Sequence, residues 1–393
     1  MISKFGSLYI GHVDLADIGF AGTPVDQRRL SSAQLAGVFA KAESIAVLME
    51  RLGYDALWLG EHHFQHEGHE CIPNPLLLGV HLSHLTERIK FGCAFNVTPN
   101  WHPLRLAEDY ATADILTNGR IIFGVGRGYH TREVETFGAP LIDQDANREL
   151  FEEQVEIIFK AFNQPSFSHH GKNYQIPPRV PYRGYRLEEI TLVPRPRHLP
   201  VECYQPIVSA SQRGIDFMAR NGIKAMIGGG AAVAEGAAEE LIQTWRRSLA
   251  RAGRKTEPGG DLVVNFYTHL ADTEERAEAE VRPFVEEYLK VFAPAGLIDL
   301  PEYQLAALAS GSGTEESGLS EVVDQILASA WLCGPPDSIA ARLTAVQERY
   351  PGLEQVNVGS VIGTPETVVL EQLRRFGEEV MPRFRAEREE CPG

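Results

Sequence analysis

The 393-residue sequence lacks the cysteine pattern of a disulfide-rich or zinc-binding protein. A disulfide framework usually has an even number of cysteines, and a structural zinc site usually takes two of them from one CxxC motif. This sequence has an odd number, wide spacing and no CxxC motif: Cys71, Cys93, Cys203, Cys333 and Cys391. The pattern favours free thiols in a reducing compartment, so we expect a cytoplasmic protein.

Membrane-spanning, secretory and nucleic-acid-binding segments are also missing. No apolar run is long enough to span a bilayer, and residues 1–11 lack the charged start, apolar stretch and cleavage site of a signal peptide. Basic residues are in the minority, with 37 Lys and Arg against 53 Asp and Glu, which gives a net charge of -16. Because an acidic surface repels nucleic acid and anionic lipid, we expect neither as a partner. An anionic cofactor would need a local basic group.

What the sequence does contain is an alternation of short apolar runs with long amphipathic stretches, the pattern of β/α units. Strands are predicted at residues 5–11, 55–59, 89–95, 120–125, 207–209, 225–227, 262–270 and 355–361. Helices are predicted at residues 33–52, 103–116, 146–162, 211–221, 232–252, 273–292, 335–350 and 365–389. The apolar content of 44% is ample for a large core. We expect one (β/α)8 TIM-barrel domain over residues 1–393, since such barrels often exceed ordinary domain size.

Two segments interrupt this rhythm and are predicted to be insertions. Residues 164–206 contain eight prolines, which disfavour regular helices and central strands and indicate an extended excursion over the surface. Residues 293–320 include the flexible stretch SGSGT at 310–314. Such a stretch forms either a plain surface loop or a mobile lid, and the sequence leaves both open.

The densest cluster of chemically active side chains is EHHFQHEGHE at residues 61–70, directly after the second predicted strand. The carboxyl ends of barrel strands face the active site, so this segment belongs at its mouth. The spacing is not that of HExxH, which disfavours a metal site. The alternative of a polar surface loop stays open. We favour one or two histidines that enter the pocket as neutral imidazoles and exchange a proton near pH 7.

Three further motifs follow strand ends. In FGVGRGYH (residues 123–130) the third glycine comes too early for a dinucleotide fingerprint, but Arg127 between two glycines is a candidate to pair with a phosphate. The alternative is an arginine that caps a helix. In IVSASQRG (residues 207–214), Ser211 near a helix start can hold an anion or form an ordinary N-cap. In NWHP (residues 100–103), Trp101 and His102 can line a substrate pocket or, for Trp101, pack in the core.

Together these segments resemble the bacterial luciferase family of flavin monooxygenases, especially the luciferase α subunit. The resemblance is carried in order along the chain by GYD at 53–55, EHHF at 61–64, HP at 102–103 with ED at 108–109, GR at 119–120, FGV at 123–125, RG at 127–128, FG at 137–138, GPP at 334–336 and VMP at 380–382. Ala210, Gly126 and Phe95 depart from the luciferase pattern. Luciferases have a glutamate, a cysteine and a smaller residue there.

The resemblance implies a (β/α)8 barrel that holds reduced FMN at the carboxyl ends of its strands. Oxygen would add to the flavin to give a C4a-hydroperoxide, which oxidises a small organic substrate. By position, His62 matches the family's catalytic histidine, and His63, Trp101 and His102 are the expected substrate-pocket residues. The expected cofactor contacts are Ala94 and Phe95 at an often cis peptide below the flavin ring, and Arg127, Ala210, Ser211 and Gly214 near the phosphate. No metal is expected.

The resemblance also implies a homodimer and a mobile lid at residues 293–320. No NAD(P)H-binding segment is recognisable, so a separate flavin reductase is the expected partner. Three alternatives stay open. The first is a deazaflavin (F420)-dependent oxidoreductase on the same barrel, the second a metal-dependent hydrolase that uses the histidine cluster, and the third a flavin-binding protein without catalysis.

Overall fold

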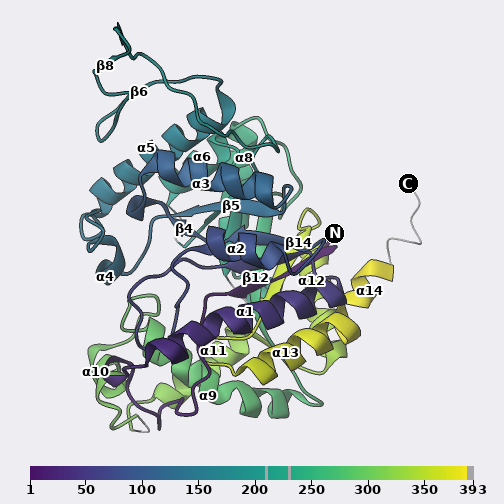
Figure 1. Ribbon diagram of the computed structural model, residues 1–393. Coiled ribbons are helices and arrows are strands. Elements are labelled where there is room, and N and C mark those ends of the chain that lie inside the picture. The colour runs from purple at the N-terminus through teal and green to yellow at the C-terminus, as the bar shows by residue number, and fades with distance from the viewer. Residues whose placement is uncertain (209–210, 229–231, 315, 387–393) are drawn as a thin grey trace.

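The computed structural model describes residues 1–208, 211–228, 232–314 and 316–386. Eight parallel strands form a closed ring at the centre, and helices surround it (Figure 1). The ring closes because β10 pairs with both β5 and β11, and β14 pairs with β1. The predicted (β/α)8 barrel is therefore confirmed. In ring order the strands are β1 (Lys4–Tyr9), β2 (Ala56–Leu59), β3 (Lys90–Cys93), β5 (Ile121–Gly126), β10 (Cys203–Pro206), β11 (Lys224–Gly228), β12 (Leu262–Leu270) and β14 (Gln355–Gly359).

The surrounding helices follow the strands along the chain. They are α1 (Ser32–Leu52), α2 (Pro75–Ser83), α3 (Pro103–Leu116), α4 (Thr131–Val134), α5 (Gln144–Asn163), α6 (Gln212–Arg220), α7 (Ala232–Glu235), α8 (Glu239–Arg251), α9 (Glu274–Phe292), α10 (Glu302–Ser310), α11 (Leu319–Ala330), α12 (Pro336–Arg349), α13 (Glu366–Arg375) and α14 (Met381–Ala386). A π-helical turn, Phe376–Val380, joins the last two. Short strands β4 (Asn96–Val97) and β13 (Trp331–Gly334) extend the sheet beside β5 and β12.

Local sequence signals explain where the helices begin and end. Ser31 and Gln34 form a capping box at the start of α1, and Gly53 ends that helix in the left-handed conformation, with φ 77°. Pro103 occupies the first turn of α3, where its missing N–H costs no hydrogen bond. Most of the helices that the sequence predicts lie close to their predicted ranges. Among the described residues, no helix is both long and apolar enough to cross a membrane.

The fifth barrel strand lies earlier than predicted. The sequence favoured residues 207–209, but the strand is β10, Cys203–Pro206. Cys203 and Tyr204 are buried and pair with β5, whereas Val208 is 81% exposed. The prediction was wrong because Pro206 was taken to exclude a strand. It is the last residue of β10, a position where proline is tolerated.

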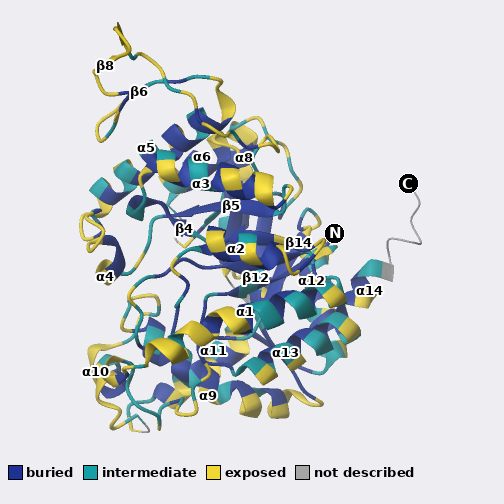
Figure 2. Ribbon diagram, in the orientation of Figure 1, coloured by how far each residue is buried: buried dark blue, intermediate teal, exposed yellow. Residues whose placement is uncertain are grey.

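The first insertion projects from the barrel. It carries two small antiparallel hairpins, β6 (His169–His170) with β7 (Gln175–Ile176), and β8 (Pro181–Tyr182) with β9 (Tyr185–Arg186). Figure 1 shows the hairpins at the top, away from the ring, and Figure 2 shows them largely exposed. This agrees with the predicted surface excursion.

The second insertion is more regular than predicted. The expected flexible loop at residues 293–320 contains α10 and leads into α11. Ala307 and Leu308 of α10 are buried in a small apolar cluster with Leu319 of α11. The Gly and Ser residues therefore mark the turn between two packed helices, with Gly311 in the left-handed conformation at φ 66°.

The described cysteines are free thiols, as the sequence predicts. Cys93, Cys203 and Cys333 are buried, and Cys71 is partly buried. Burial raises the pKa of all four, to about 12 for Cys71 and Cys333. The thiols are therefore protonated at neutral pH. Cys391 lies outside the described residues.

Candidate active site

A cavity of about 560 Å³ opens at the carboxyl ends of the barrel strands. Six strands line it with residues in or at the end of their carboxyl halves: Leu8, Gly126, Pro206, Gly228, Phe266 and Val358. The other two strands contribute residues that directly follow them, Glu61 and His62 after β2, and Ala94 and Phe95 after β3. This is the end at which TIM-barrel enzymes place their active sites.

Of the histidines in residues 61–70, His62 is the one that lines the cavity. Its Nδ1 lies 3.2 Å from Glu133 Oε1, and its Nε2 lies 3.3 Å from Glu70 Oε1. The residue is only 8% exposed. Burial alone would lower the pKa of His62, but the negative charges of Glu70 and Glu133 outweigh it and raise the pKa to about 9. His62 is therefore an imidazolium at neutral pH, whereas the sequence favoured a neutral imidazole.

The two carboxylates that hold His62 are themselves enclosed and hydrogen-bonded. Glu70 accepts a hydrogen bond from the Tyr129 hydroxyl, and its Oε2 lies 2.8 Å from His130 Nε2. Burial would raise the pKa of Glu70, but the charge of His62 and the bond with His130 lower it to about 2. Glu133 also accepts from the side chain of Gln65 at 2.7 Å. His62 thus lies in a buried network that fixes its orientation.

Glu61 separates two predicted pocket residues from the cavity. The Trp101 indole donates to Glu61 at 2.8 Å, and His63 Nε2 lies 3.0 Å from the same carboxylate. The backbone N–H of Val97 also donates to it, at 3.0 Å. Glu61 lines the cavity, but His63 and Trp101 do not. They lie behind the first layer of side chains and orient Glu61.

His102 lies away from the cavity. It is the N-cap of α3, and its Nδ1 accepts a hydrogen bond from the backbone N–H of Leu104 at 3.3 Å. Its ring packs edge-on against Tyr174, with centroids 5.5 Å apart. In this structure its contacts are those of a helix cap, and a role in substrate binding stays a prediction.

The predicted phosphate contacts surround the start of α6, and an unpredicted arginine joins them. Arg127 lines the cavity and donates to Asn147 at 3.2 Å. A Cβ on Gly214 would lie 3.2 Å from Arg148 Nη1 and 3.9 Å from the Ser211 hydroxyl. Burial and the charge of Arg148 lower the pKa of Arg127. Ala210 lies outside the described residues.

The peptide between Ala94 and Phe95 is cis, as the resemblance implied, and both residues line the cavity. A Cβ on Gly126 would lie 3.2 Å from Phe95 Cβ, so glycine lets β5 approach this peptide closely. Tyr267, Tyr288 and Phe292 form an aromatic side of the cavity, together with Leu297 of the second insertion.

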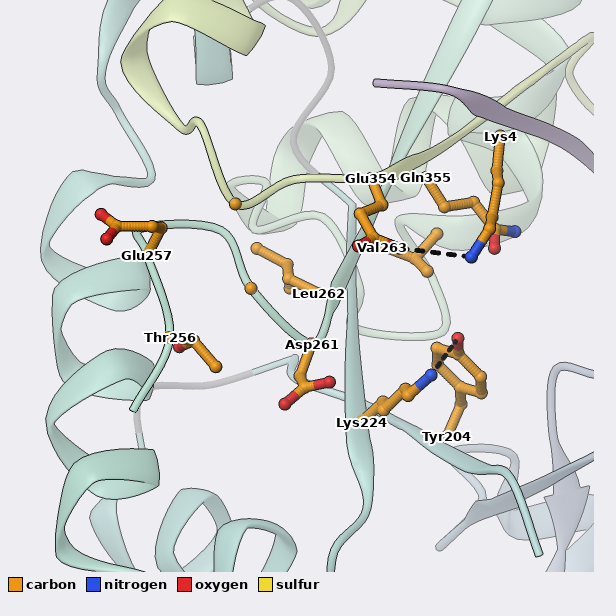
Figure 3. A pocket seen from close by; sticks show the side chains of 12 residues that line it. Lys4, Tyr204, Lys224, Thr256, Glu257, Asp261, Leu262, Val263, Glu354 and Gln355 are labelled. Carbon is orange, nitrogen blue, oxygen red and sulfur yellow. Dashed lines mark hydrogen bonds and ion pairs between the residues drawn. The ribbon is translucent and has the colours of Figure 1, made fainter. Parts of the chain in front are cut away.

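A smaller cavity, of about 320 Å³, lies at the amino end of the barrel (Figure 3). It is lined by residues at the starts of strands, among them Lys4, Lys224 and Gln355. The Lys4 ammonium lies 3.2 Å from Glu354, and the Lys224 ammonium 2.7 Å from Glu202. These ion pairs are open to solvent.

Comparison with known proteins assigns the family. Residues 20–351 match the family described as luciferase-like monooxygenase. This chain belongs to the luciferase-like monooxygenase family. The match covers most of the barrel and confirms the resemblance on which the predicted site rests.

Individual relatives share modest identity with the chain. An uncharacterized protein of Sinorhizobium fredii, y4vJ, is 36% identical over 143 residues, which is 36% of this chain and 39% of that protein. Limonene 1,2-monooxygenase of Rhodococcus erythropolis is 23% identical over 341 residues, covering 86% of this chain and 79% of the relative. The first of these matches thus spans well under half of the relative.

Solved luciferase-like structures share the whole fold. The oxygenating constituent of 3,6-diketocamphane monooxygenase from Pseudomonas putida, in complex with FMN, superposes with a TM-score of 0.72 at 19% identity, covering 98% of this chain and 99% of that one. An F420-dependent tetrahydromethanopterin reductase from Methanopyrus kandleri gives 0.66 at 17%, covering 98% and 100%. At these identities the likeness shows the barrel alone, which accommodates both cofactor types.

Several members of this luciferase-like site were not predicted. Tyr129 and His130 follow Arg127 directly, so their place after a strand end was an available signal. Glu70 belongs to the histidine-rich segment. Nothing in the sequence around Glu133 predicts its contact with His62, because the two residues are 71 positions apart in the chain. The ligand atoms of His62, Glu70 and His130 lie within 4.8 Å of one another, but hydrogen bonds among these groups already account for that closeness.

Proposed function

We propose that this chain is the oxygenase component of a two-component monooxygenase, which uses reduced FMN and O2 to oxidise a small organic molecule. A separate flavin reductase would supply the reduced FMN. The observation that carries the proposal is that one cavity holds a guanidinium group, Arg127, and a buried, carboxylate-bound imidazole, His62. The family match and the FMN-bound structural relative support it.

The residues at the start of α6 fit a phosphate. Burial and the positive charge of Arg148 lower the pKa of Arg127, and a bound anion would relieve the repulsion between the two guanidinium groups. The Ser211 side chain makes no capping bond to α6, and among the described residues nothing else caps the first N–H groups of the helix, so they are candidates to bind an anion. A Cβ on Gly214 would meet Arg148 Nη1 at 3.2 Å, so glycine forms a cradle in which that guanidinium approaches the helix start. We assign the FMN phosphate to this cradle.

The isoalloxazine would lie against Ala94 and Phe95, between the phosphate cradle and His62. Bound reduced flavin would supply the electrons that activate O2. His62 would donate a proton from Nε2, whose contact with Glu70, at 3.3 Å, is long for a hydrogen bond, and its positive charge would favour an anionic ring beside it. Glu70 and Glu133 hold the ring of His62 in place and maintain its charge, so they are positioning residues. A closed, largely apolar cavity would keep water from the reaction.

Anaerobic titration tests the proposal. The purified protein should bind reduced FMN more tightly than oxidised FMN, followed by absorbance and by protein fluorescence. Reduced FMN with O2 and a substrate should then give an oxygenated product that carries an atom from labelled O2. Tight binding of F420 without binding of FMN would replace the proposal with the deazaflavin alternative.

A further inference from the structure

The aromatic side of the cavity differs in chemistry from the phosphate cradle. Tyr267 and Tyr288 meet edge-on with ring centroids 5.7 Å apart, and Tyr288 lies 4.7 Å from Phe292. Trp331 stacks on Tyr267 at 4.8 Å and braces it from behind. Leu297, from the second insertion, also lines the cavity. These side chains come from β12, α9, β13 and the segment after α9, so separate elements converge to make an apolar surface.

The aromatic side offers no free charge of either sign. Arg127 is the only Lys or Arg among the described residues that line the cavity, and it belongs to the phosphate cradle. Glu70 is bound by Tyr129, His130 and His62. Glu61 is bound by Trp101, His63 and the Val97 N–H.

Tyr267, Tyr288, Phe292 and Leu297 themselves carry no charge, so an ionic group held against them would lose its hydration without gaining a partner, which disfavours its binding strongly.

The tyrosine pair does offer one directional contact. Tyr267 and Tyr288 both line the cavity with their rings in edge-on contact, and their hydroxyls influence each other. Each hydroxyl carries one proton, so at most one of the two protons is shared between the oxygens and at least one remains for a ligand. No hydrogen bond from either hydroxyl to another residue is found in the described part of the chain. Burial raises the pKa of both hydroxyls, so both stay protonated donors.

We propose that the aromatic side binds a neutral, largely apolar organic molecule that carries one hydrogen-bond-accepting oxygen, with the Tyr267–Tyr288 pair donating to that oxygen. This inference rests on the proposed function, because the bound molecule is then the substrate. It assigns the chemical class that the site selects: uncharged molecules over carboxylates and ammonium ions of the same shape.

Three probes of nearly equal shape test the selection by charge. Cyclohexyl methyl ketone, cyclohexanecarboxylate and 1-cyclohexylethylammonium are titrated into the full chain, with and without FMN. Binding is followed by calorimetry and by protein fluorescence, to which Trp331 contributes beside the proposed site. The ketone should bind at least tenfold more tightly than either ion. Equal or tighter binding of the carboxylate would overturn the proposal.

Two variants test the contacts. Tyr288→Phe should weaken ketone binding about two- to tenfold, the range for one neutral hydrogen bond. It should not weaken binding of the hydrocarbon in which CH2 replaces the ketone oxygen. Leu297→Arg introduces a cation at a position that is 46% exposed, and it should reverse the preference in favour of the carboxylate. Val193→Arg, on the exposed first insertion, is the matched control and should change nothing. If Leu297→Arg leaves the preference unchanged, the assignment of this side of the cavity is wrong.

The outcome is separable from that of the proposed function. A ketone preference in protein that binds no FMN would uphold the aromatic site and reject the monooxygenase. FMN binding together with no preference among the probes would reject the aromatic site and leave the proposed monooxygenase standing.

Discussion

The two ends of the barrel both gather charged side chains, but they hold them in opposite ways. At the amino end, the Lys4 and Glu354 side chains are 49% and 67% exposed, and water screens the pair. At the carboxyl end, the side chains of His62, Glu70 and Glu133 are 9%, 2% and 1% exposed. The pKa values of His62 and Glu70 are strongly shifted, because burial removes the screening. The comparison teaches that charge alone does not mark a candidate site, and that buried charge on the cavity wall distinguishes this one.

The largest expected effect comes from removing the imidazole. His62→Ala should lower substrate oxidation by about 10²- to 10⁴-fold, the usual cost of losing one acid–base group. Lys4→Ala at the amino end should leave the rate unchanged. Rapid mixing of each variant with reduced FMN and O2, followed by product analysis, gives the rates. If His62→Ala oxidised substrate as fast as the parent, the charged groups of the carboxyl end would matter no more for the rate than those of the amino end.

Breaking one buried pair should cost stability as well. Glu70→Gln leaves His62 and His130 without their shared carboxylate, and loss of one partner in a buried pair typically costs about 3–5 kcal/mol. The same change at Glu354 should cost less than about 1 kcal/mol. Urea unfolding measures both, and an NMR titration should show a lower pKa for His62 in Glu70→Gln. Equal costs at the two ends would contradict the comparison.

The buried imidazolium predicts how stability depends on pH. The folded pKa of His62 is raised from 6.5 to about 9, so its stabilising contribution is complete below pH 6.5 and disappears as the pH rises through 9. That loss is on the order of a few kcal/mol. Unfolding at pH 6.5 and at pH 9.5 should show it in the parent protein, and His62→Gln should reduce it. Lys224→Met, at the amino end, should lose as much unfolding free energy between pH 6.5 and pH 9.5 as the parent protein does.

Within the carboxyl end, the phosphate cradle should show a smaller and ligand-specific effect. Arg127→Ala should weaken FMN binding roughly ten- to hundredfold, from the loss of a charge-assisted bond of about 1.5–3 kcal/mol. Riboflavin has no phosphate, so its binding should change little. Arg105→Ala is the control, since that arginine pairs with Glu108 at 2.7 Å on the exposed surface. Equal losses for FMN and riboflavin would move the phosphate away from Arg127.

The smallest effect is expected at the solvent-exposed ion pairs of the amino end. The double variant Lys4→Ala, Lys224→Ala removes the two ammonium groups seen in Figure 3. Each lost surface pair should cost less than about 1 kcal/mol in unfolding free energy. FMN binding should be unaffected. A large loss of FMN affinity would show that the two ends communicate.

Sequence reasoning reached the barrel and the location of the site because both depend on local pattern. The order of apolar runs predicted eight strands, and strand ends predicted that His62 and Arg127 would line one cavity. The protonation of His62 was out of reach, because Glu133 approaches from a distant segment. His63 and His102 look equivalent to His62 in sequence, yet one binds Glu61 and the other caps α3. Only three-dimensional packing separates them.

The protonated state of the cysteines affects how readily the protein is inactivated by oxidation. Oxygen-activating flavoproteins release some hydrogen peroxide, and peroxide attacks thiolates rather than thiols. Cys71, Cys93, Cys203 and Cys333 are all held in the thiol form, and none of them lines the cavity. Gly126, where luciferases carry a cysteine, leaves the cavity itself without sulfur at that position. Under the proposed function, the chain should therefore resist oxidative inactivation by its own side product.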